Sequence, residues 1–181
     1  MNCAIAKSNF ILTSFNRDNK PTIEIIGAVS KADNCLNIEY LLTGNLSKII
    51  VPQPEKTLRQ SELWEHTCFE LFIKLKNSSK YWEFNFSPSR NWNVFRFLDY
   101  RLNIVEEKAF DSLPFDVSQN INCLQLKAHI DLDRLEIADK DLEIAISAVI
   151  ENRKQKLSYW ALNHPAAEAD FHHPDSFTIS F

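Results

Sequence analysis

Short segments of alternating or wholly apolar residues, separated by polar clusters, follow one another along almost the whole chain. Segments of about five to ten residues with this pattern are typical of β-strands. Clusters of Asn, Asp, Ser, Pro and Lys mark the turns between them, as at Lys31–Asn34, Lys76–Lys80 and Pro88–Asn91. The sequence predicts strands at Thr22–Ser30, Cys35–Thr43, Thr67–Lys76, Lys80–Ser87, Asn91–Tyr100, Ile121–Asp131, Asp141–Glu151, Ser158–Leu162 and Phe177–Phe181.

Helical patterns are weak and short. Gln53–Leu63 and Glu106–Phe115 are the two segments that favour a helical turn or two. Because no longer helices separate the strands, the pattern indicates an antiparallel sheet rather than βαβ units. We predict an all-β protein, a jelly-roll-like antiparallel β-sandwich with one or two short helices. The 181 residues suit one domain over residues 1–181.

The charge and hydropathy of the chain exclude several classes of partner. The formal net charge is −4 and no basic stripe occurs, so we expect neither nucleic-acid binding nor attraction to an anionic membrane. No apolar run is long enough to span a bilayer, and the first twenty residues lack the pattern of a secretion signal. We therefore expect a cytoplasmic protein. Its scattered cysteines, Cys3, Cys35, Cys68 and Cys123, are expected to be free thiols.

Polar side chains interrupt the expected strands around Trp64–Arg101. Alternation along the strands places Glu70 on one face of the first strand, and Glu83, Asn85 and Ser87 on one face of the second. The next strand supplies Arg96, with Trp92 nearby.

A carboxylate, an amide, a guanidinium and an indole on one sheet face are the components of a carbohydrate site. Planar polar groups form bidentate hydrogen bonds, and an aromatic ring covers the apolar face of a sugar. The sequence predicts a ligand cleft beside Glu70, Asn85 and Arg96, with Trp92 or Trp160 as the platform. The alternative is a solvated face on which Glu70 and Arg96 form an ion pair and Trp92 packs.

A histidine-rich loop is expected near the C-terminus, between Trp160 and Phe177. We predict that this loop forms one wall of the cleft, with His164 and His172 close to the ligand. Imidazole and carboxylate groups also bind metals, so a site formed by His164, Asp170 and His172 is an alternative. Its spacing matches no metal motif, and His172 and His173 are adjacent; we expect no metal and histidines bonded to backbone carbonyls.

Motifs of the common catalytic sites are missing from the sequence. GxGxxG, GxxxxGK[ST], GxSxG and HExxH do not occur. Glu70 and Glu83 as a glycosidase pair, and His66 with Cys68 as a thiol–imidazole nucleophile, are the enzymatic alternatives. We predict a protein that binds its ligand without catalysis.

Four strings of residues carry a resemblance to a known family. They are LWEHTCFELFI (Leu63–Ile73), YWEFNFSPSRNW (Tyr81–Trp92), FLDYR (Phe97–Arg101) and SYWALNHP…DFHHPDSF near the end. Over residues 22–181 the chain resembles uncharacterised bacterial DOMON-like proteins, which are related to the family 9 carbohydrate-binding modules.

The resemblance implies a β-sandwich whose relatives bind sugars between aromatic side chains or, in cytochrome branches, haem b. Trp64, Trp92 and Trp160 are the candidate aromatic residues here. Met1 is the only methionine, so haem would need two histidines, drawn from His66, His129, His164 and His172. We expect a small saccharide or similar ligand and no cofactor; the alternatives are a haem- or metal-binding DOMON-type domain, or a protein-interaction domain without a small ligand.

Overall fold

The computed structural model describes residues 6–15, 22–53 and 56–181, and the polypeptide is almost entirely β-structure over these ranges. Five antiparallel strands form sheet A in the order β1–β2–β3–β9–β8. Their bounds are β1 (Ala6–Ser14), β2 (Ile23–Ala32), β3 (Cys35–Gly44), β8 (Phe115–Gln119) and β9 (Cys123–Asp131).

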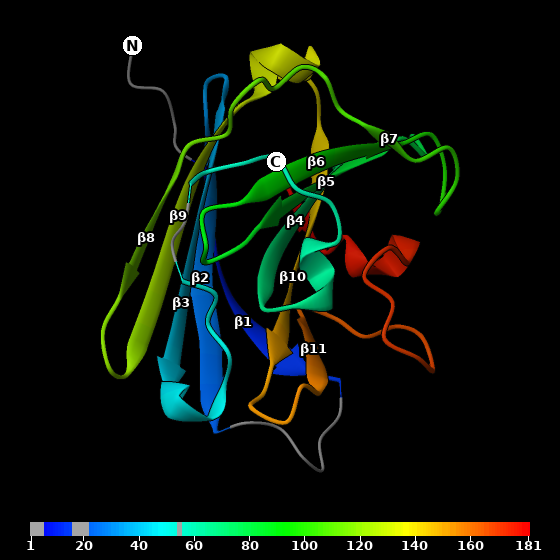
Figure 1. Cartoon of the computed structure of the whole chain (residues 1–181). Coiled ribbons are helices and arrows are strands. Elements are labelled where there is room, and N and C mark those ends of the chain that lie inside the picture. Colours follow the sequence, from blue (N-terminus) through cyan, green and yellow to red (C-terminus); the bar gives the residue numbers. More distant parts are fainter. Residues whose placement is uncertain (1–5, 16–21, 54–55) are drawn as a thin grey trace.

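Sheet B faces sheet A and has the order β7–β6–β5–β4–β10–β11–β1, with one further short strand beside β10. Its strands are β4 (Cys68–Leu75), β5 (Tyr81–Phe86), β6 (Trp92–Phe97), β7 (Val105–Glu106), β10 (Leu142–Glu151), β11 (Leu157–Ala161) and β12 (Ile179–Ser180). The start of β1 pairs with β2 and its end pairs with β11, so one strand joins the two sheets along an edge. Figure 1 shows the resulting curled sandwich.

The all-β antiparallel fold expected from the sequence is confirmed. Most of the expected strands form close to the predicted bounds, whereas β1, β7 and β8 were not predicted. The alternation in β8 is weak, and pairing with β9 rather than burial holds this strand in the sheet.

The helical turns lie elsewhere than expected. They are short 3₁₀ turns at Leu46–Lys48, Leu63–Glu65, Leu132–Leu135 and Pro174–Ser176. Among the described residues of 53–63 only Leu63 is in such a turn, and Glu106–Phe115 is extended or irregular. In the Glu106–Phe115 segment the Arg59 guanidinium donates to the carbonyls of Glu107 and Phe110, so these two acceptors are satisfied without a helix.

The sequence has two glycines, so turns of this chain place other residues, Asn and Asp but also Glu, Gln and Arg, in the left-handed conformation that glycine usually takes. Asp33, Asn77 and Asn103 adopt left-handed backbone conformations, with φ of 49°, 60° and 54°. Gly27, by contrast, lies inside β2 and serves close packing. A Cβ there would lie 2.0 Å from the carbonyl oxygen of Glu39 and 2.5 Å from the Phe10 ring.

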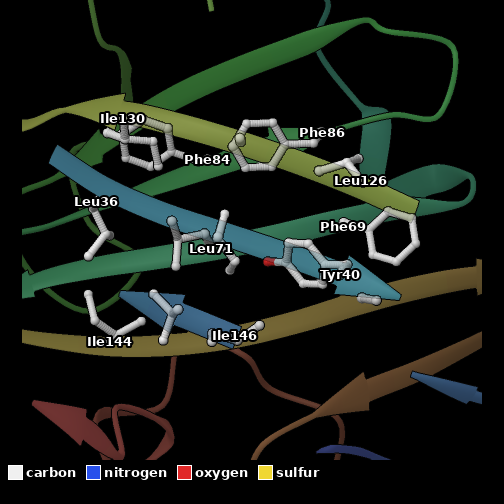
Figure 2. Close-up of a cluster of buried hydrophobic side chains, with 14 of the residues drawn as sticks. Leu36, Tyr40, Phe69, Leu71, Phe84, Phe86, Leu126, Ile130, Ile144 and Ile146 are labelled. Atoms are coloured by element: carbon white, nitrogen blue, oxygen red, sulfur yellow. The ribbon is translucent and has the colours of Figure 1, made fainter. Parts of the chain in front are cut away.

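The main core lies between the two sheets. Alternate residues of β3 and β9 meet those of β4, β5 and β10, and Figure 2 shows Tyr40, Phe69, Leu71 and Phe84 within this layer. The Tyr40 hydroxyl, buried in this core, donates to the backbone carbonyl of Glu70 at 2.7 Å. The odd-numbered residues of β4 and even-numbered residues of β5 therefore point inward, which fixes what the opposite face of sheet B presents.

Candidate functional site

The face of sheet B that points away from sheet A is covered rather than exposed to solvent. All residues of β5 and the first six of β4 are buried, on both faces of the sheet. The segment between β11 and β12 covers this face; Figure 1 shows it in red and orange on the side of β10 away from sheet A. A second apolar cluster forms here, from Phe72, Tyr81, Phe95, Phe97 and Ala145 with Phe171 and Phe177.

Two glutamates lie side by side on this covered face. The register pairs Glu70 with Asn85 and Phe72 with Glu83, so the two carboxyl groups are diagonal neighbours on adjacent strands. Glu70 is 2% exposed and Glu83 is 6% exposed. The Ser147 hydroxyl donates to Oε2 of Glu70 at 2.9 Å, and the Asn85 amide donates to Oε1 of Glu83 at 2.7 Å.

Burial makes both carboxyl groups weaker acids than an exposed glutamate. Loss of water, followed by repulsion from Glu83, raises the pKa of Glu70 to about 8. Burial raises the pKa of Glu83 to about 7, against the opposing effects of the Asn85 hydrogen bond and the Arg101 charge. The two groups titrate together, so the pair retains protons near neutral pH.

Hydrogen bonds connect the turn after β6, through Tyr81, to His172 of the covering segment. The backbone N–H of Arg101 donates to the Tyr81 hydroxyl at 3.2 Å, and that hydroxyl lies 2.9 Å from Nδ1 of His172. Burial, with help from the Arg101 charge, lowers the pKa of His172 to about 4, so its ring is neutral at pH 7. We assign the Tyr81 proton to Nδ1 of His172, which places the histidine proton on Nε2, 3.7 Å from Oε2 of Glu83.

Asp170 fastens the covering segment to the turn after β6. Its carboxylate accepts from the Arg101 guanidinium at 2.8 Å and from the Tyr100 hydroxyl at 2.6 Å. It also accepts the backbone N–H of His172 at 3.1 Å. Although burial opposes the effect, the hydrogen bonds from Tyr100 and Arg101 lower the pKa of Asp170. We call Asp170 with its partners Tyr100 and Arg101 the latch. It holds the backbone of His172, whose ring lines the same cavity as the two glutamates.

A cavity of about 600 Å³ remains between this face of sheet B and its cover. Its polar lining comes from Glu65, Glu70, Glu83, Arg101 and His172. Its aromatic lining comes from Trp64, Phe95, Phe97, Tyr159 and Phe171. Trp64 is 38% exposed at the rim, and its ring meets Phe95 edge-on at 5.7 Å between centroids. A pocket of this size with aromatic walls and a few polar groups suits a small organic ligand.

Four of the predicted ligand residues line this cavity: Trp64, Glu70, Glu83 and His172. Asn85 lies beside them through its hydrogen bond to Glu83.

Trp92 and Arg96 lie on the opposite face of sheet B, contrary to expectation. The register pairs Phe86 with Trp92 and Trp82 with Arg96, which directs both side chains toward the core side. Trp92 packs in the main core with Arg59 over its ring, and Arg96 lies 4.0 Å from Glu107. The alternative Glu70–Arg96 ion pair does not form for the same reason.

The remaining predicted residues are engaged outside the cavity. Ser87 accepts from Ser89 within the turn after β5. Trp160 is buried in the main core, because its partner Ala148 faces inward. Nε2 of His164 lies 2.8 Å from the carbonyl oxygen of Thr13, and its ring packs on Phe15. That carbonyl contact is of the kind expected for a histidine of this loop.

Sequence reasoning missed the cation of the pocket and most of its aromatic residues. Phe95 and Phe97 share a face of β6 with Asn93. The register between β5 and β6 pairs Phe95 with Glu83, which shows that this face points toward the cavity. Arg101 follows a strand end and has φ of 53°, a turn conformation without a sequence signal. Tyr159 and Phe171 reach the pocket from β11 and from the covering segment.

The structure separates the residues of the metal and haem alternatives. His164 lies apart, at the carbonyl of Thr13, whereas Asp170 and His172 share one hydrogen-bond network in which Asp170 is occupied by Tyr100 and Arg101 and His172 by Tyr81. Within residues 6–15, 22–53 and 56–181, no group of three or more His, Cys, Asp or Glu side chains is arranged to hold a metal ion. Of the four candidate haem histidines only His172 lines the cavity; His66 contacts Glu151 and His129 contacts Asn37.

Two further findings bear on the expectations for this chain. No helix among the described residues is long and apolar enough to cross a bilayer. Cys35, Cys68 and Cys123 are free, and Cys3 lies outside the described residues.

No family model matches the chain, and no curated protein matches it by sequence. Among solved structures, the fold is similar to that of a protein from Bacteroides uniformis named "putative carbohydrate-binding protein". The TM-score is 0.71, and the alignment covers 94% of this chain and 84% of the other, with 10% sequence identity. The likeness establishes a shared fold.

Proposed function

We propose that this protein binds a small saccharide, without cleaving it, in the cavity on the outer face of sheet B. The observation that carries the proposal is the lining itself, in which aromatic rings and carboxyl groups converge on a cavity of about 600 Å³. Aromatic rings cover the apolar faces of a sugar ring, while carboxylate, guanidinium and imidazole groups bond its hydroxyls.

The fold shared with a protein named for carbohydrate binding supports this proposal. The resemblance to DOMON-like proteins and family 9 carbohydrate-binding modules agrees with it and stays a prediction. A cytoplasmic location is likewise a proposal, consistent with the free thiols of Cys35, Cys68 and Cys123.

Tryptophan fluorescence tests the proposal directly. Trp82, Trp92 and Trp160 are buried, whereas Trp64 is partly exposed at the rim of the cavity, so a bound sugar should change the emission of Trp64. We expect a saturable change with one or more monosaccharides or disaccharides, and its loss in Trp64→Phe. Calorimetry should still detect binding to that variant, more weakly, and no binding to Tyr159→Ala with Phe97→Leu.

The matched control is Leu98→Ala, which changes an exposed apolar residue outside the lining and should bind as the unaltered protein does. If no saccharide produces heat or a fluorescence change, the sugar proposal is wrong. If nuclear magnetic resonance shows that a bound disaccharide is cleaved, the non-catalytic part of the proposal is wrong.

A further inference from the structure

The lining of the cavity has more acidic than basic groups. Glu65, Glu70 and Glu83 line it, and Arg101 is its one basic side chain that is charged at neutral pH. The guanidinium of Arg101 is already paired with Asp170, and His172 is neutral at pH 7. Arg101 therefore acts on the two glutamates through its charge at a distance, and in the described part of the chain it forms no salt bridge with either of them.

Each buried glutamate keeps one oxygen unused by the described residues. Glu70 accepts through Oε2 and Glu83 through Oε1, whereas the other two oxygens have no donor within hydrogen-bonding distance. Among the described residues, Nε of Arg96 is the one side-chain polar atom that is both fully buried and without a hydrogen-bond partner. The two glutamate oxygens are not in this class, so they retain some accessible surface. Both oxygens are thus accessible from the cavity, on diagonal neighbours of adjacent strands.

Aromatic rings line the cavity together with the two glutamates. Phe95 is the cross-strand partner of Glu83, and Trp64 packs on Phe95. Phe97 follows on the same face and stacks on Tyr81, with centroids 4.5 Å apart. The faces of aromatic rings attract cations, and carboxylates provide the strongest hydrogen bonds to an ammonium group.

We propose that the ligand of this pocket carries a protonated amino group, as an amino sugar does, and that Glu70 and Glu83 hold this ammonium beside Phe95. The identity of the rest of the ligand as a sugar rests on the proposed function above. An anionic ligand fits less well, because Asp170 already balances the charge of Arg101 and the ionised glutamates would repel an anion.

The titratable groups around the pair determine how binding responds to pH. They come from the opposite sheet, from the neighbouring strands and from the cover: Tyr40, Cys68, Tyr81, Arg101, Asp170 and His172. Tyr40, Cys68 and Tyr81 have raised pKa values and are neutral below pH 8, and His172 is neutral above pH 6. Between pH 6 and 8 the groups of this set that change charge are the two glutamates, so an arriving ammonium displaces protons from them.

Four ring compounds separate the amino group from the sugar. We would measure the affinities of glucose, glucosamine, N-acetylglucosamine and cyclohexylamine at pH 7 by calorimetry. Glucosamine should bind about tenfold more tightly than glucose and N-acetylglucosamine, which lack the charge. Cyclohexylamine, which has the charge without hydroxyls, should bind more weakly than glucosamine and several-fold more tightly at pH 8 than at pH 6.

Glu83→Gln tests the placement of the charge. It replaces the carboxylate with a neutral group of the same shape and should bring the ratio of glucosamine to glucose affinity close to one. The matched control is Glu39→Gln on the outer face of sheet A, which should keep the ratio of the unaltered protein. Melting temperatures verify that both variants fold. If Glu83→Gln does not fold, Glu70→Gln provides the same test.

The outcomes distinguish this inference from the function on which it builds. Equal binding of glucose and glucosamine would keep the sugar and refute the ammonium. Equal binding of cyclohexylamine and glucosamine, without glucose binding, would keep the ammonium and refute the sugar. Binding of none of the four would refute the ammonium site. The sugar proposal would then depend on whether any other monosaccharide or disaccharide binds in the fluorescence titration described above.

Discussion

The outer faces of the two sheets have similar sequence patterns and very different surroundings. On sheet A, β3 and β9 alternate between buried residues and partly exposed ones, and polar side chains such as Glu39, Gln125 and Lys127 lie toward solvent. On sheet B, the corresponding positions of β4 and β5 are buried, including Glu70 and Glu83. The same residue type is a solvated surface group on one sheet and a weak acid beside a cavity on the other.

The difference comes from what lies over each face. The segment between β11 and β12, fastened by Asp170 and filled by Phe171 and His172, covers sheet B and excludes water from it. An alternating strand determines which side chains share a face, and a distant segment determines whether that face is dry. Changes on the covered face should therefore have larger effects than changes on the open face of sheet A.

Truncation of a covered ring should have the largest effect. Phe97→Ala removes a ring that stacks on Tyr81 and contacts His172, and should lower the free energy of unfolding by about 3 kcal/mol. Glu39→Ala, on the open face of sheet A, should change it by less than about 0.5 kcal/mol. Urea unfolding measures both, and equal effects would show that the cover does not pack as described.

The pH dependence of stability should come from the covered glutamates. Their folded pKa values, about 8 and about 7, lie above the ordinary value of 4.5, so the folded state holds protons that the unfolded state has released. Stability from these groups therefore falls as pH rises from about 4.5 to 8. His172, whose pKa is lowered to about 4, has the opposite effect below pH 6.5 and none above it.

Between pH 6.5 and 8, the free energy of unfolding should consequently fall by about 2 kcal/mol, at about 1.4 kcal/mol per proton and pH unit. Glu70→Gln should flatten this slope markedly. Glu24→Gln on the open sheet should leave it unchanged. Urea titrations at three pH values provide the measurement, and a wild-type slope of zero would contradict the buried pair.

The latch should have a smaller effect. Asp170→Asn weakens the bonds from Arg101 and Tyr100 and should cost about 1 kcal/mol, a value kept low because Arg101 is half exposed. Hydrogen exchange should become faster in the backbone around His172. Lys127→Gln, which removes the exposed ion pair with Glu39 at 3.5 Å, should cost less than about 0.5 kcal/mol. Equal protection of the covering segment in Asp170→Asn and the wild type would exclude a latch.

How far the candidate site could be predicted depends on the range of the physical signal. Glu70 and Glu83 were found because alternation within a strand is local. Arg96 and Trp92 were assigned to the wrong face because the relative register of β5 and β6 depends on the intervening turn, which the sequence pattern left open. Arg101 gave no signal, since its place in the pocket depends on a turn and on Asp170, 69 residues away along the chain.

The sequence by itself determined most of the β-strands, the antiparallel all-β class and the direction of each side chain relative to its own strand. These follow from periodicity and turn chemistry within a few residues. Only the tertiary structure decided which face of sheet B is covered, which rings surround Glu70 and Glu83, and that their pKa values are raised. Water exclusion depends on every segment packed over a site, and the segments around this one, near Trp64, near Arg101 and between β11 and β12, are far apart in the sequence.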